Sequence, residues 1–264
     1  ITLMKSERKT AVITGGLGLL GIAMSEFLSD RGFHVIVIDN IDINTKLKNN
    51  ISYIKFDLED IKSYPLLVDE IRKLTSNLTC LINNAAFNPK IEQNDKGFGS
   101  FEDLDIDTWN REVNLNLIAP IFLTKALLEL FNFKKNEYCK IINIISTYGI
   151  VPPNQSIYKE LSKKTGVDIV KPIGYPVTKA GLAMATKYLS VYLGENGFNV
   201  NGLAPGGIEN NQDEVFINSY SNQVPMGRMA KVEEMLETVY LLSSEGSNYI
   251  SGQIIAVDGG WTTW

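Results

Sequence analysis

The sequence predicts one α/β domain built on a doubly wound parallel sheet of about seven strands. Three observations lead to this fold class. Seven short apolar runs recur along the chain, helix-like patterns lie between them, and each run is continuous rather than alternating. Continuous apolar runs are typical of parallel strands that helices cover on both faces. The chain of 264 residues shows no linker, internal repeat or low-complexity tract, so we expect a single domain over 1–264.

The elements follow one another in the order that such a sheet requires. The first strand, 10–15, and the first helix, 19–32, are separated by a glycine-rich turn. That helix and the helical pattern 176–197 both end at a glycine, which is a common C-terminal cap. The longest helical pattern is 106–130. The remaining predicted strands are 34–39, 51–57, 78–86, 140–146, 198–206 and 254–260. Repeated units of this kind imply right-handed crossovers between parallel strands.

Composition excludes several classes of function. Apolar residues make up 44% of the chain and charged residues 21%, which is typical of a folded globular domain. The apolar runs of the predicted strands fall short of the ~20 residues that a membrane helix requires. A net charge of -5 without a basic stripe argues against a nucleic-acid partner. We therefore expect a small-molecule substrate, with neither a membrane nor a nucleic acid as partner.

Cysteine and histidine usage indicates a reducing compartment and no metal site. Cys80 and Cys139 lie in or beside apolar strand-like runs, so we expect buried thiols and no disulfide framework. The first ten residues lack the apolar core of a secretory signal, and a cytoplasmic location is expected. His34 is the only histidine, too few for a His-based metal site, and its place at the start of a strand argues against a Ser-His-Asp triad.

The turn after the first strand reads TGGLGLLG over 14–21. Gly16, Gly18 and Gly21 fit the pattern G-x-G-x-x-G, in which glycines let a pyrophosphate approach backbone N–H groups at a helix N-terminus. A tight turn without a ligand is the alternative. Asp39 ends the second strand, where a carboxylate can accept hydrogen bonds from the adenosine ribose and would repel a 2′-phosphate. This combination predicts a dinucleotide, NAD rather than NADP.

A tyrosine and a lysine lie four residues apart in KPIGYPVTKAG, 171–181. Pro176 follows the tyrosine, and proline is favoured in the first helical turn because its missing N–H has no intrahelical partner there. Tyr175 and Lys179 are then expected on one helix face at the carboxyl edge of the sheet. An ammonium beside a phenol stabilises phenolate and lowers the phenol pKa towards that of a useful general base. A surface Tyr–Lys pair is the alternative.

Several further motifs occur in a fixed order along the chain. They are KFDLED at 55–60, NNAA at 83–86, WNREVNLNL at 109–117, INIIS at 142–146, YPVTK at 175–179, LAPGGI at 203–208, PMGRMAKVEEM at 225–235 and VDGGW at 257–261. Together with the glycine turn, they make the chain resemble a short-chain dehydrogenase/reductase over nearly its whole length. The resemblance implies a Rossmann fold and an enzyme that transfers hydride between NAD and a secondary alcohol or ketone.

The resemblance also implies a role for individual residues. Counted from Trp109, the helical asparagine that supports the proton relay falls on Asn116 and not on Asn114. The implied catalytic residues are Asn116, Ser146, Tyr175 and Lys179. The implied cofactor-binding residues are Gly15, Gly18, Leu19, Leu20, Asp39, Asp57, Leu58, Asn83, Asn84, Ala85, Ala86, Tyr175, Lys179, Pro205, Gly206 and Ile208. The implied substrate-binding residues are Ser146, Tyr148, Tyr175 and Gly207.

Two features depart from the family pattern. The shorter branch of the family usually has a glycine where Leu19 stands, and the glycine spacing here resembles the extended branch of sugar-nucleotide epimerases and dehydratases. Ser146 and Tyr175 are 29 residues apart, more than double the usual separation. We expect the extra segment, about 150–172, to cover the catalytic mouth as a lid with a short helix within 156–164. A solvated insertion is the alternative.

A narrower likeness comes from STYG at 146–149, PGGIENNQ at 205–212 and the terminal tryptophans. These resemble the subgroup associated with flagellin modification (flagellin modification protein A-like), nonulosonic-acid and surface-glycan biosynthesis, which implies a polar, sugar-derived substrate. Two other functions stay open: a nucleotide-sugar epimerase or dehydratase with tightly bound NAD, and a catalytically vestigial NAD(H)-sensing protein. Trp261 and Trp264, exposed on a tail, would imply a homo-oligomer, a tetramer or a dimer.

Overall fold

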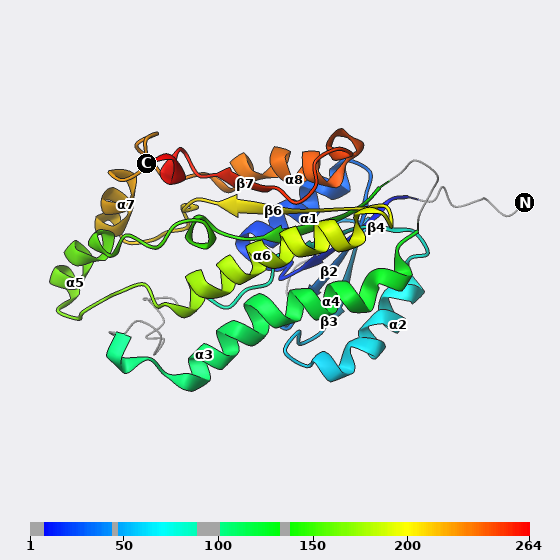
Figure 1. The fold of residues 1–264 in the computed structure, drawn as a ribbon, viewed down its shortest axis with the longest axis horizontal. Coiled ribbons are helices and arrows are strands. Elements are labelled where there is room, and N and C mark those ends of the chain that lie inside the picture. The colour runs from blue at the N-terminus through cyan, green and yellow to red at the C-terminus, as the bar shows by residue number, and fades with distance from the viewer. Residues whose placement is uncertain (1–7, 44–46, 89–100, 133–137) are drawn as a thin grey trace, which may run out of the picture.

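A seven-stranded parallel sheet forms the middle layer of the computed structural model, which describes residues 8–43, 47–88, 101–132 and 138–264 (Figure 1). The sheet has the order β3-β2-β1-β4-β5-β6-β7. The strands are β1 (Thr10–Thr14), β2 (His34–Asp39), β3 (Ile51–Lys55), β4 (Leu78–Asn83), β5 (Cys139–Ile144), β6 (Phe198–Pro205) and β7 (Ile254–Val257). All seven predicted strands are confirmed. Most end one to three residues earlier than predicted, because the chain leaves the sheet there to form the site.

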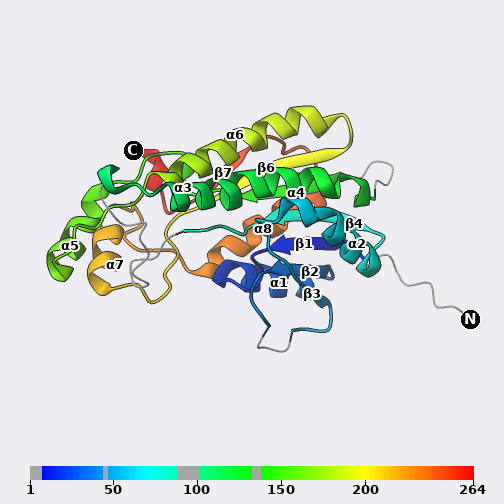
Figure 2. The same cartoon turned by 90° about the horizontal axis from the view of Figure 1, so that it is seen from below.

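Helices cover both faces of the sheet (Figures 1 and 2). On one face lie α1 (Leu19–Asp30) and α8 (Leu236–Ser243), whose apolar side chains share a core cluster with the strands. On the other lie α2 (Tyr64–Leu74), α4 (Ala119–Leu127) and α6 (Gly174–Gly194), which contribute to a second cluster. Burial on both faces is the reason that the strands carry continuous apolar runs.

The predicted helix 106–130 is confirmed as one helical run. It comprises α3 (Ile106–Val113), a π-helical turn (Asn114–Ile118), α4 and a final 3₁₀ turn. Within the described part of the chain, this is the one helix long and apolar enough to cross a membrane by length and composition, and 33% of its most apolar window is buried. Its buried apolar residues, such as Leu123 and Leu127, belong to the core beneath the sheet.

The insertion lies beyond the carboxyl edge of the sheet, beside α7 (Glu214–Ser221). A 3₁₀ turn (Gln155–Tyr158) leads into α5 (Lys159–Thr165), so the predicted short helix is confirmed. Ile157, Leu161 and Ile169 are buried in a cluster that also contains residues of α7 and the C-terminus. A purely solvated insertion is therefore wrong, because the segment has an apolar interior of its own.

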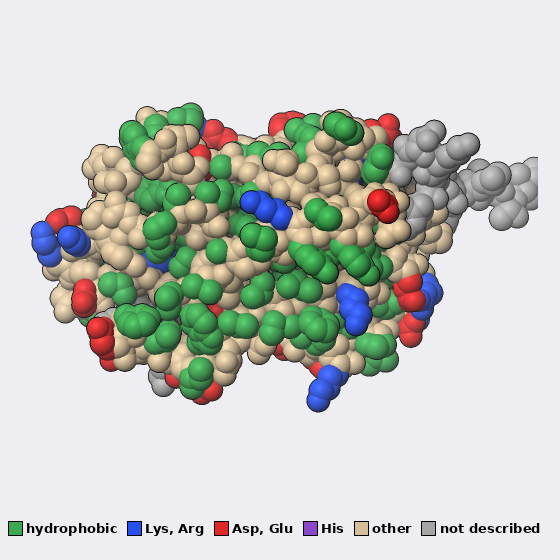
Figure 3. Space-filling model, viewed as in Figure 1, with side chains coloured by type: hydrophobic (Ala, Val, Ile, Leu, Met, Phe, Trp, Pro, Cys, Tyr) green, Lys and Arg blue, Asp and Glu red, His purple; other side chains and the backbone are tan. Residues whose placement is uncertain are grey.

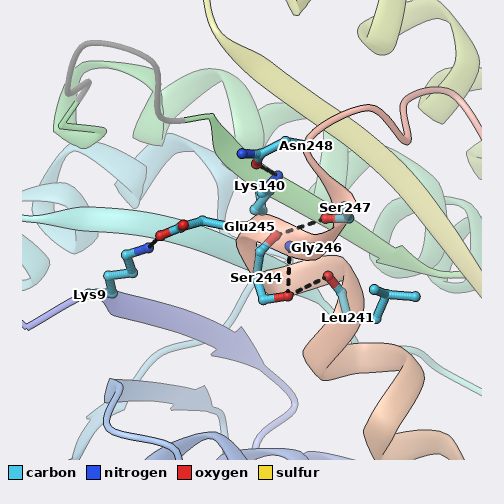
Figure 4. Close-up of polar contacts among 8 residues, drawn as sticks. All are labelled: Lys9, Lys140, Leu241, Ser244, Glu245, Gly246, Ser247 and Asn248. Atoms are coloured by element: carbon cyan, nitrogen blue, oxygen red, sulfur yellow. Dashed lines mark hydrogen bonds and ion pairs between the residues drawn. The ribbon is translucent and has the colours of Figure 1, made fainter.

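A buried lysine, Lys140, lies at the amino end of β5, on the side of the sheet away from the insertion (Figure 4). Lys140, only 3% exposed, donates from Nζ to Asn248 Oδ1 at 2.7 Å. It also donates to Asn199 Oδ1 at 2.6 Å. Beside it, Lys9 Nζ forms an ion pair with Glu245 Oε1 at 2.7 Å. These contacts tie β1, β5 and β6 to the turn that follows α8. Burial lowers the pKa of Lys140 to about 8.

Candidate active site

The glycine turn is hydrogen-bonded to the segment that follows β4. Gly15 has φ +60°, and a Cβ there would lie 2.8 Å from Ala85 Cα. Thr14 Oγ1 accepts from the backbone N–H groups of Asn84 and Ala85, and Asn84 Nδ2 donates back to the carbonyl oxygens of Thr14 and Gly15. A Cβ at Gly21 would lie 2.1 Å from Gly15 O. The α1 N-terminus is thus held against a glycine-rich turn, and the missing side chains of its glycines allow the close approach of a phosphate.

Asp39 supports the same turn from the end of β2. Its Oδ2 accepts from Leu17 N at 3.0 Å, and its Oδ1 accepts from Asn40 N at 2.8 Å. The carboxylate also lines the cavity that the glycine turn opens into. Asp39 therefore has a structural role in the loop in addition to the predicted contact with a ribose.

One cavity of about 630 Å³ joins the glycine turn to Tyr175. The carboxyl ends of β1, β2, β4, β5 and β6 converge on it, as expected for ligand sites in open α/β sheets. Its wall contains the predicted residues Gly15, Gly18, Leu19, Leu20, Asp39, Asp57, Leu58, Asn84, Ala85, Ala86, Ser146, Tyr148, Tyr175, Lys179, Pro205, Gly206, Gly207 and Ile208. Two predicted residues, Asn83 and Asn116, lie outside the wall.

The prediction that Asn83 lines the cofactor was wrong. Asn83 is the last residue of β4 and is 4% exposed. Its Nδ2 donates to Asn143 Oδ1 at 2.8 Å and to Thr124 Oγ1 at 3.2 Å, which ties β4 to β5 and α4. The next residue, Asn84, lies beyond the strand, where its side chain bonds to the glycine turn and lines the cavity.

Asn116 and Asn114 have different surroundings, as the sequence predicted. Asn116 is buried in the π-helical turn, whereas Asn114 is exposed. Asn116 exchanges two hydrogen bonds with the backbone of Phe87, and its Nδ2 donates to Thr178 Oγ1 at 3.3 Å. Thr178 lies on α6 between Tyr175 and Lys179. Asn116 thus links the segment after β4 to the helix that carries the tyrosine.

Ser146, Tyr175 and Lys179 come together at the carboxyl end of β5. The helix α6 begins at Gly174, so Pro176 occupies its first turn, as predicted. Ser146 and Tyr175 line the same cavity, and Ser146 Oγ accepts from Tyr148 N at 3.2 Å. Lys179 is 2% exposed, its Nζ lies 5.7 Å from the centroid of the Tyr175 ring, and it donates to Ile144 O at 2.7 Å.

Burial dominates the protonation of this group. Desolvation raises the pKa of Tyr175 above its ordinary value, while the hydrogen bond from Ser146 lowers it. Desolvation also lowers the pKa of Lys179 to about 8. The expectation that Lys179 by itself brings the Tyr175 pKa down is therefore not met in the protein without a bound ligand. The phenol stays protonated at neutral pH and is placed to act as an acid towards an oxygen held by Ser146.

Two charged residues beside Tyr175 were missed by the sequence reasoning. Lys171, in the stem of the insertion, is 7% exposed, its Nζ lies 4.5 Å from the Tyr175 ring centroid, and it bonds to Asn88 Oδ1. Glu112, on α3, is fully buried. Burial lowers the pKa of Lys171 to about 8 and raises that of Glu112 to about 7. Glu112 lies within the motif at 109–117 and Lys171 at the start of 171–181, but no role was assigned to either, because only the tertiary arrangement places them beside Tyr175.

Aromatic side chains from the insertion and α7 form the outer part of the cavity wall. They are Tyr148, Tyr158, Phe216 and Tyr220. Tyr220 OH accepts from Gly207 N at 2.7 Å, and its ring stacks on Trp261 at 4.5 Å. Trp261 is therefore buried within its own chain, contrary to the expectation of an exposed tail, whereas Trp264 is 79% exposed.

Comparisons with known proteins agree with this site. The family described as enoyl-(acyl carrier protein) reductase matches residues 20–262. A 3-oxoacyl-(acyl-carrier-protein) reductase of Buchnera aphidicola is 29% identical, with 97% of this chain and 98% of the relative covered. Post-translational flagellin modification protein A of Campylobacter coli is 24% identical, with 97% and 98% covered, which confirms the narrower likeness.

A solved structure shows the same fold. It is a short-chain dehydrogenase of Leptospira borgpetersenii with bound NAD+, which is 28% identical and superposes with a TM-score of 0.83 over 97% of this chain and 93% of that one. The family match covers far more than half of the chain, and the glycine turn and the Ser-Tyr-Lys group line one cavity. The protein is thus a member of the short-chain dehydrogenase/reductase family of oxidoreductases.

Proposed function

We propose that the protein is an NAD-dependent oxidoreductase that interconverts a secondary alcohol and a ketone on a polar, sugar-derived substrate in the cytoplasm. One observation carries the proposal: Ser146, Tyr175 and Lys179 share a cavity with the glycine turn and Asp39. The turn that a Cβ would fill and the carboxylate at the end of β2 fit a dinucleotide. Lys171, Asn88 and Gln212 in the wall support a polar substrate.

One set of residues in the cavity would bind the cofactor, and a second set would hold the substrate and transfer its proton. When bound, NAD supplies the hydride acceptor and NADH the donor. The glycine turn and Asp39 would hold the adenosine and pyrophosphate, and Pro205, Gly206 and Ile208 would surround the nicotinamide. Ser146 would hold the substrate oxygen, and Tyr175 would give its phenolic proton to a ketone oxygen or take the proton of an alcohol.

Lys179 and the hydrogen bond from Ser146 act on the phenol rather than on the carbon that reacts. The buried ammonium of Lys179 lies on the same helix face as Tyr175 and stabilises the phenolate that forms in the reduction direction. Asn116 fixes the segment after β4 against α6, so that the cofactor side and the proton-transfer side of the cavity keep their relative position. A phenol held in this way needs no metal ion to polarise the substrate.

A panel of sugars, polyols and their keto derivatives, followed by NADH absorbance, tests the proposal. Net cofactor turnover that disappears in Tyr175→Phe supports it. Stoichiometric NAD in the purified protein, with substrate conversion but no net turnover, would favour the epimerase or dehydratase. Tight NADH binding without conversion of any substrate would favour a sensor.

We also propose a homo-oligomer that buries the outer face of α3, α4 and α6. Apolar side chains gather along this face (Figure 3). Its exposed apolar residues include Ile106, Phe122, Met184, Tyr188, Val191 and Tyr192, and the two tyrosines stack on each other. Apolar patches of this kind on a folded domain mark interfaces. Val191→Glu with Met184→Glu should lower the native mass measured by light scattering, and an unchanged mass would contradict this interface.

A further inference from the structure

A second cavity of about 610 Å³ adjoins the catalytic cavity. It lies between α3 and the two stems of the insertion, since residues of 148–155, 170–177 and α3 form most of its wall. Tyr148 and Lys171 line both cavities. The two cavities therefore adjoin at the side chains that also surround the catalytic tyrosine, and a substrate held at Tyr175 could extend from one into the other.

Glu112 is the polar group in this wall that lacks a partner. Both of its carboxylate oxygens are buried and form no hydrogen bond within the described residues. The side chain packs so closely on the start of α6 that a Cβ at Gly174 would lie 1.7 Å from Oε2. A buried carboxylate without hydrogen bonds destabilises a protein, so an arrangement of this kind points to a ligand that supplies the missing donor.

The remaining wall is mostly apolar, with one cation at the boundary to the catalytic cavity and two further carboxylates, Asp103 and Asp105, just before α3. The apolar residues are Phe101, Leu104, Ile150, Val151, Pro152, Pro153, Val170, Pro172, Ile173, Pro176, Val177 and Ala180. Glu112 can accept a hydrogen bond, and the ammonium of Lys171 can donate one. A group that combines an N–H donor, a carbonyl acceptor and an apolar end matches this wall, and an acylamino group has all three.

We propose that the second cavity binds an acylamino substituent of the substrate. The N–H group is placed against Glu112, the carbonyl oxygen faces Lys171, and the acyl carbons contact the apolar wall. The inference rests on the proposed function, because the substituent must belong to a molecule whose carbinol or keto carbon lies at Tyr175. It names a substrate class for the site: an alcohol or ketone with an amide a few bonds from the reacting carbon.

A matched series of ring alcohols tests the proposal by binding. The probes are trans-4-acetamidocyclohexanol, trans-4-aminocyclohexanol, trans-1,4-cyclohexanediol and trans-4-methylcyclohexanol, titrated calorimetrically into the protein saturated with NADH. We expect the acetamido compound to bind at least about tenfold more tightly than the methyl compound, as a site built for a polar group discriminates. Preference for the amino compound, for the diol, or for none of the four would overturn the proposal.

Two variants assign the preference to Glu112. In Glu112→Leu the acceptor is lost, and the advantage of the acetamido over the methyl compound should fall to about twofold or less. Glu112→Gln keeps one acceptor oxygen and should retain an intermediate preference. Asp107→Asn is the matched control, since Asp107 is exposed on the same helix and lies outside the wall. An unchanged preference in Glu112→Leu would overturn the assignment.

Folding and function are separated by two further measurements. Glu112→Leu should unfold at a higher temperature than the wild type, because an apolar side chain replaces an unpartnered buried carboxylate. Should that variant fail to fold, Ile150→Trp, at a wall position that is 45% exposed, fills the cavity and should abolish the acetamido preference. If the enzyme turns over a compound of the sugar and polyol panel but binds the four ring alcohols equally well, only the second-cavity proposal is overturned. If it prefers the acetamido compound but oxidises no alcohol, only the proposed function is overturned.

Discussion

Lys171 Nζ lies 4.5 Å from the centroid of the Tyr175 ring, closer than Lys179 Nζ, which lies 5.7 Å from it. Two ammonium groups therefore flank the phenol, one from its own helix and one from the stem of the insertion. A positive charge beside a phenol favours the phenolate, whereas desolvation and then the carboxylate of Glu112 raise the pKa of Tyr175. The motif predicts only Lys179, so the charge around the tyrosine is greater than the motif alone indicates.

Replacing Lys171 by Met should shift the pH dependence of alcohol oxidation. Oxidation requires the phenolate as base, and loss of a nearby positive charge raises the pKa of Tyr175. At pH values below 8, where wild-type Lys171 carries its charge, kcat for oxidation should therefore fall by about tenfold, or ~1.4 kcal/mol. The difference should shrink above the Lys171 pKa of about 8, where wild-type Lys171 also loses its charge.

Lys163→Met is the control for this shift, since Lys163 lies on α5 and its side chain is 72% exposed. Lys171→Arg keeps the charge and should restore most of the wild-type profile. A pH profile of Lys171→Met that coincides with the wild type would show that the ammonium does not act on the phenol.

Tyr175→Phe should leave NADH binding close to wild type and lower kcat by about 10²–10⁴, the usual contribution of a positioned acid or base. NADH fluorescence titration and steady-state turnover measure the two effects separately. Tyr188→Phe removes a hydroxyl from the exposed side of the same helix and should change neither. Turnover within about tenfold of wild type in Tyr175→Phe would exclude it as the proton donor.

The fold was predictable because its signals are local. Parallel strands buried on both faces carry continuous apolar runs, and the glycines of the first turn and Pro176 mark helix starts. Strand ends were less accurate: Asn83, predicted to line the cofactor together with Asn84, has a buried amide instead.

Lys171 and Glu112 could not be found in this way, because their roles depend on how an irregular stem packs on α3. For the same reason the sequence did not reveal the interior of the insertion. Its apolar residues contact α7 and Trp261 rather than each other alone, so removing 152–171 would expose that cluster as well as open the site.

Asp39→Asn tests the choice of cofactor by removing the charge at the end of β2. The amide keeps an acceptor oxygen for one of the two hydrogen bonds that Asp39 accepts, from Leu17 N at Oδ2 and from Asn40 N at Oδ1, and it carries no charge. We expect wild type to bind NADH more tightly than NADPH, and the ratio of the two dissociation constants to shrink by about tenfold in the variant. Fluorescence titration of the wild type and the variant with NADH and with NADPH measures this ratio. Tighter NADPH binding by the wild type would show that Asp39 does not face the ribose.

Gly21→Ala should abolish NADH binding without unfolding the protein. A Cβ at this position would lie 2.1 Å from Gly15 O, so α1 must move away from the turn that faces the phosphates. Gly194→Ala is the control, because a Cβ there meets no atom within 4 Å at the end of α6. The control should bind NADH normally and be more stable by about 0.5–1 kcal/mol. Normal binding by Gly21→Ala would exclude the turn as the pyrophosphate site.

Lys140→Met should change how stability depends on pH at the edge of the sheet opposite the site. The pKa of Lys140 is lowered to about 8 by burial, and the ordinary value of a lysine is 10.5. Between these values the unfolded chain binds more protons than the folded one, so the Lys140 contribution to stability rises with pH across this window. Below pH 8 the folded protein keeps the full cost of a buried ammonium, which its bonds to Asn199 and Asn248 offset in part.

The measurement is urea unfolding of wild type and Lys140→Met from pH 7 to pH 10.5. The variant loses two hydrogen bonds at every pH, which displaces its curve by a constant amount. What identifies the titration is the slope: the stability of wild type minus that of the variant should grow by up to about 3 kcal/mol from pH 8 to pH 10.5. The ion pair of Lys9 with Glu245 is present in both proteins and cancels in the difference. A difference that stays level across this range would mean that Lys140 carries its proton in the folded protein as readily as in the unfolded chain, and that its two asparagine partners compensate fully for its burial.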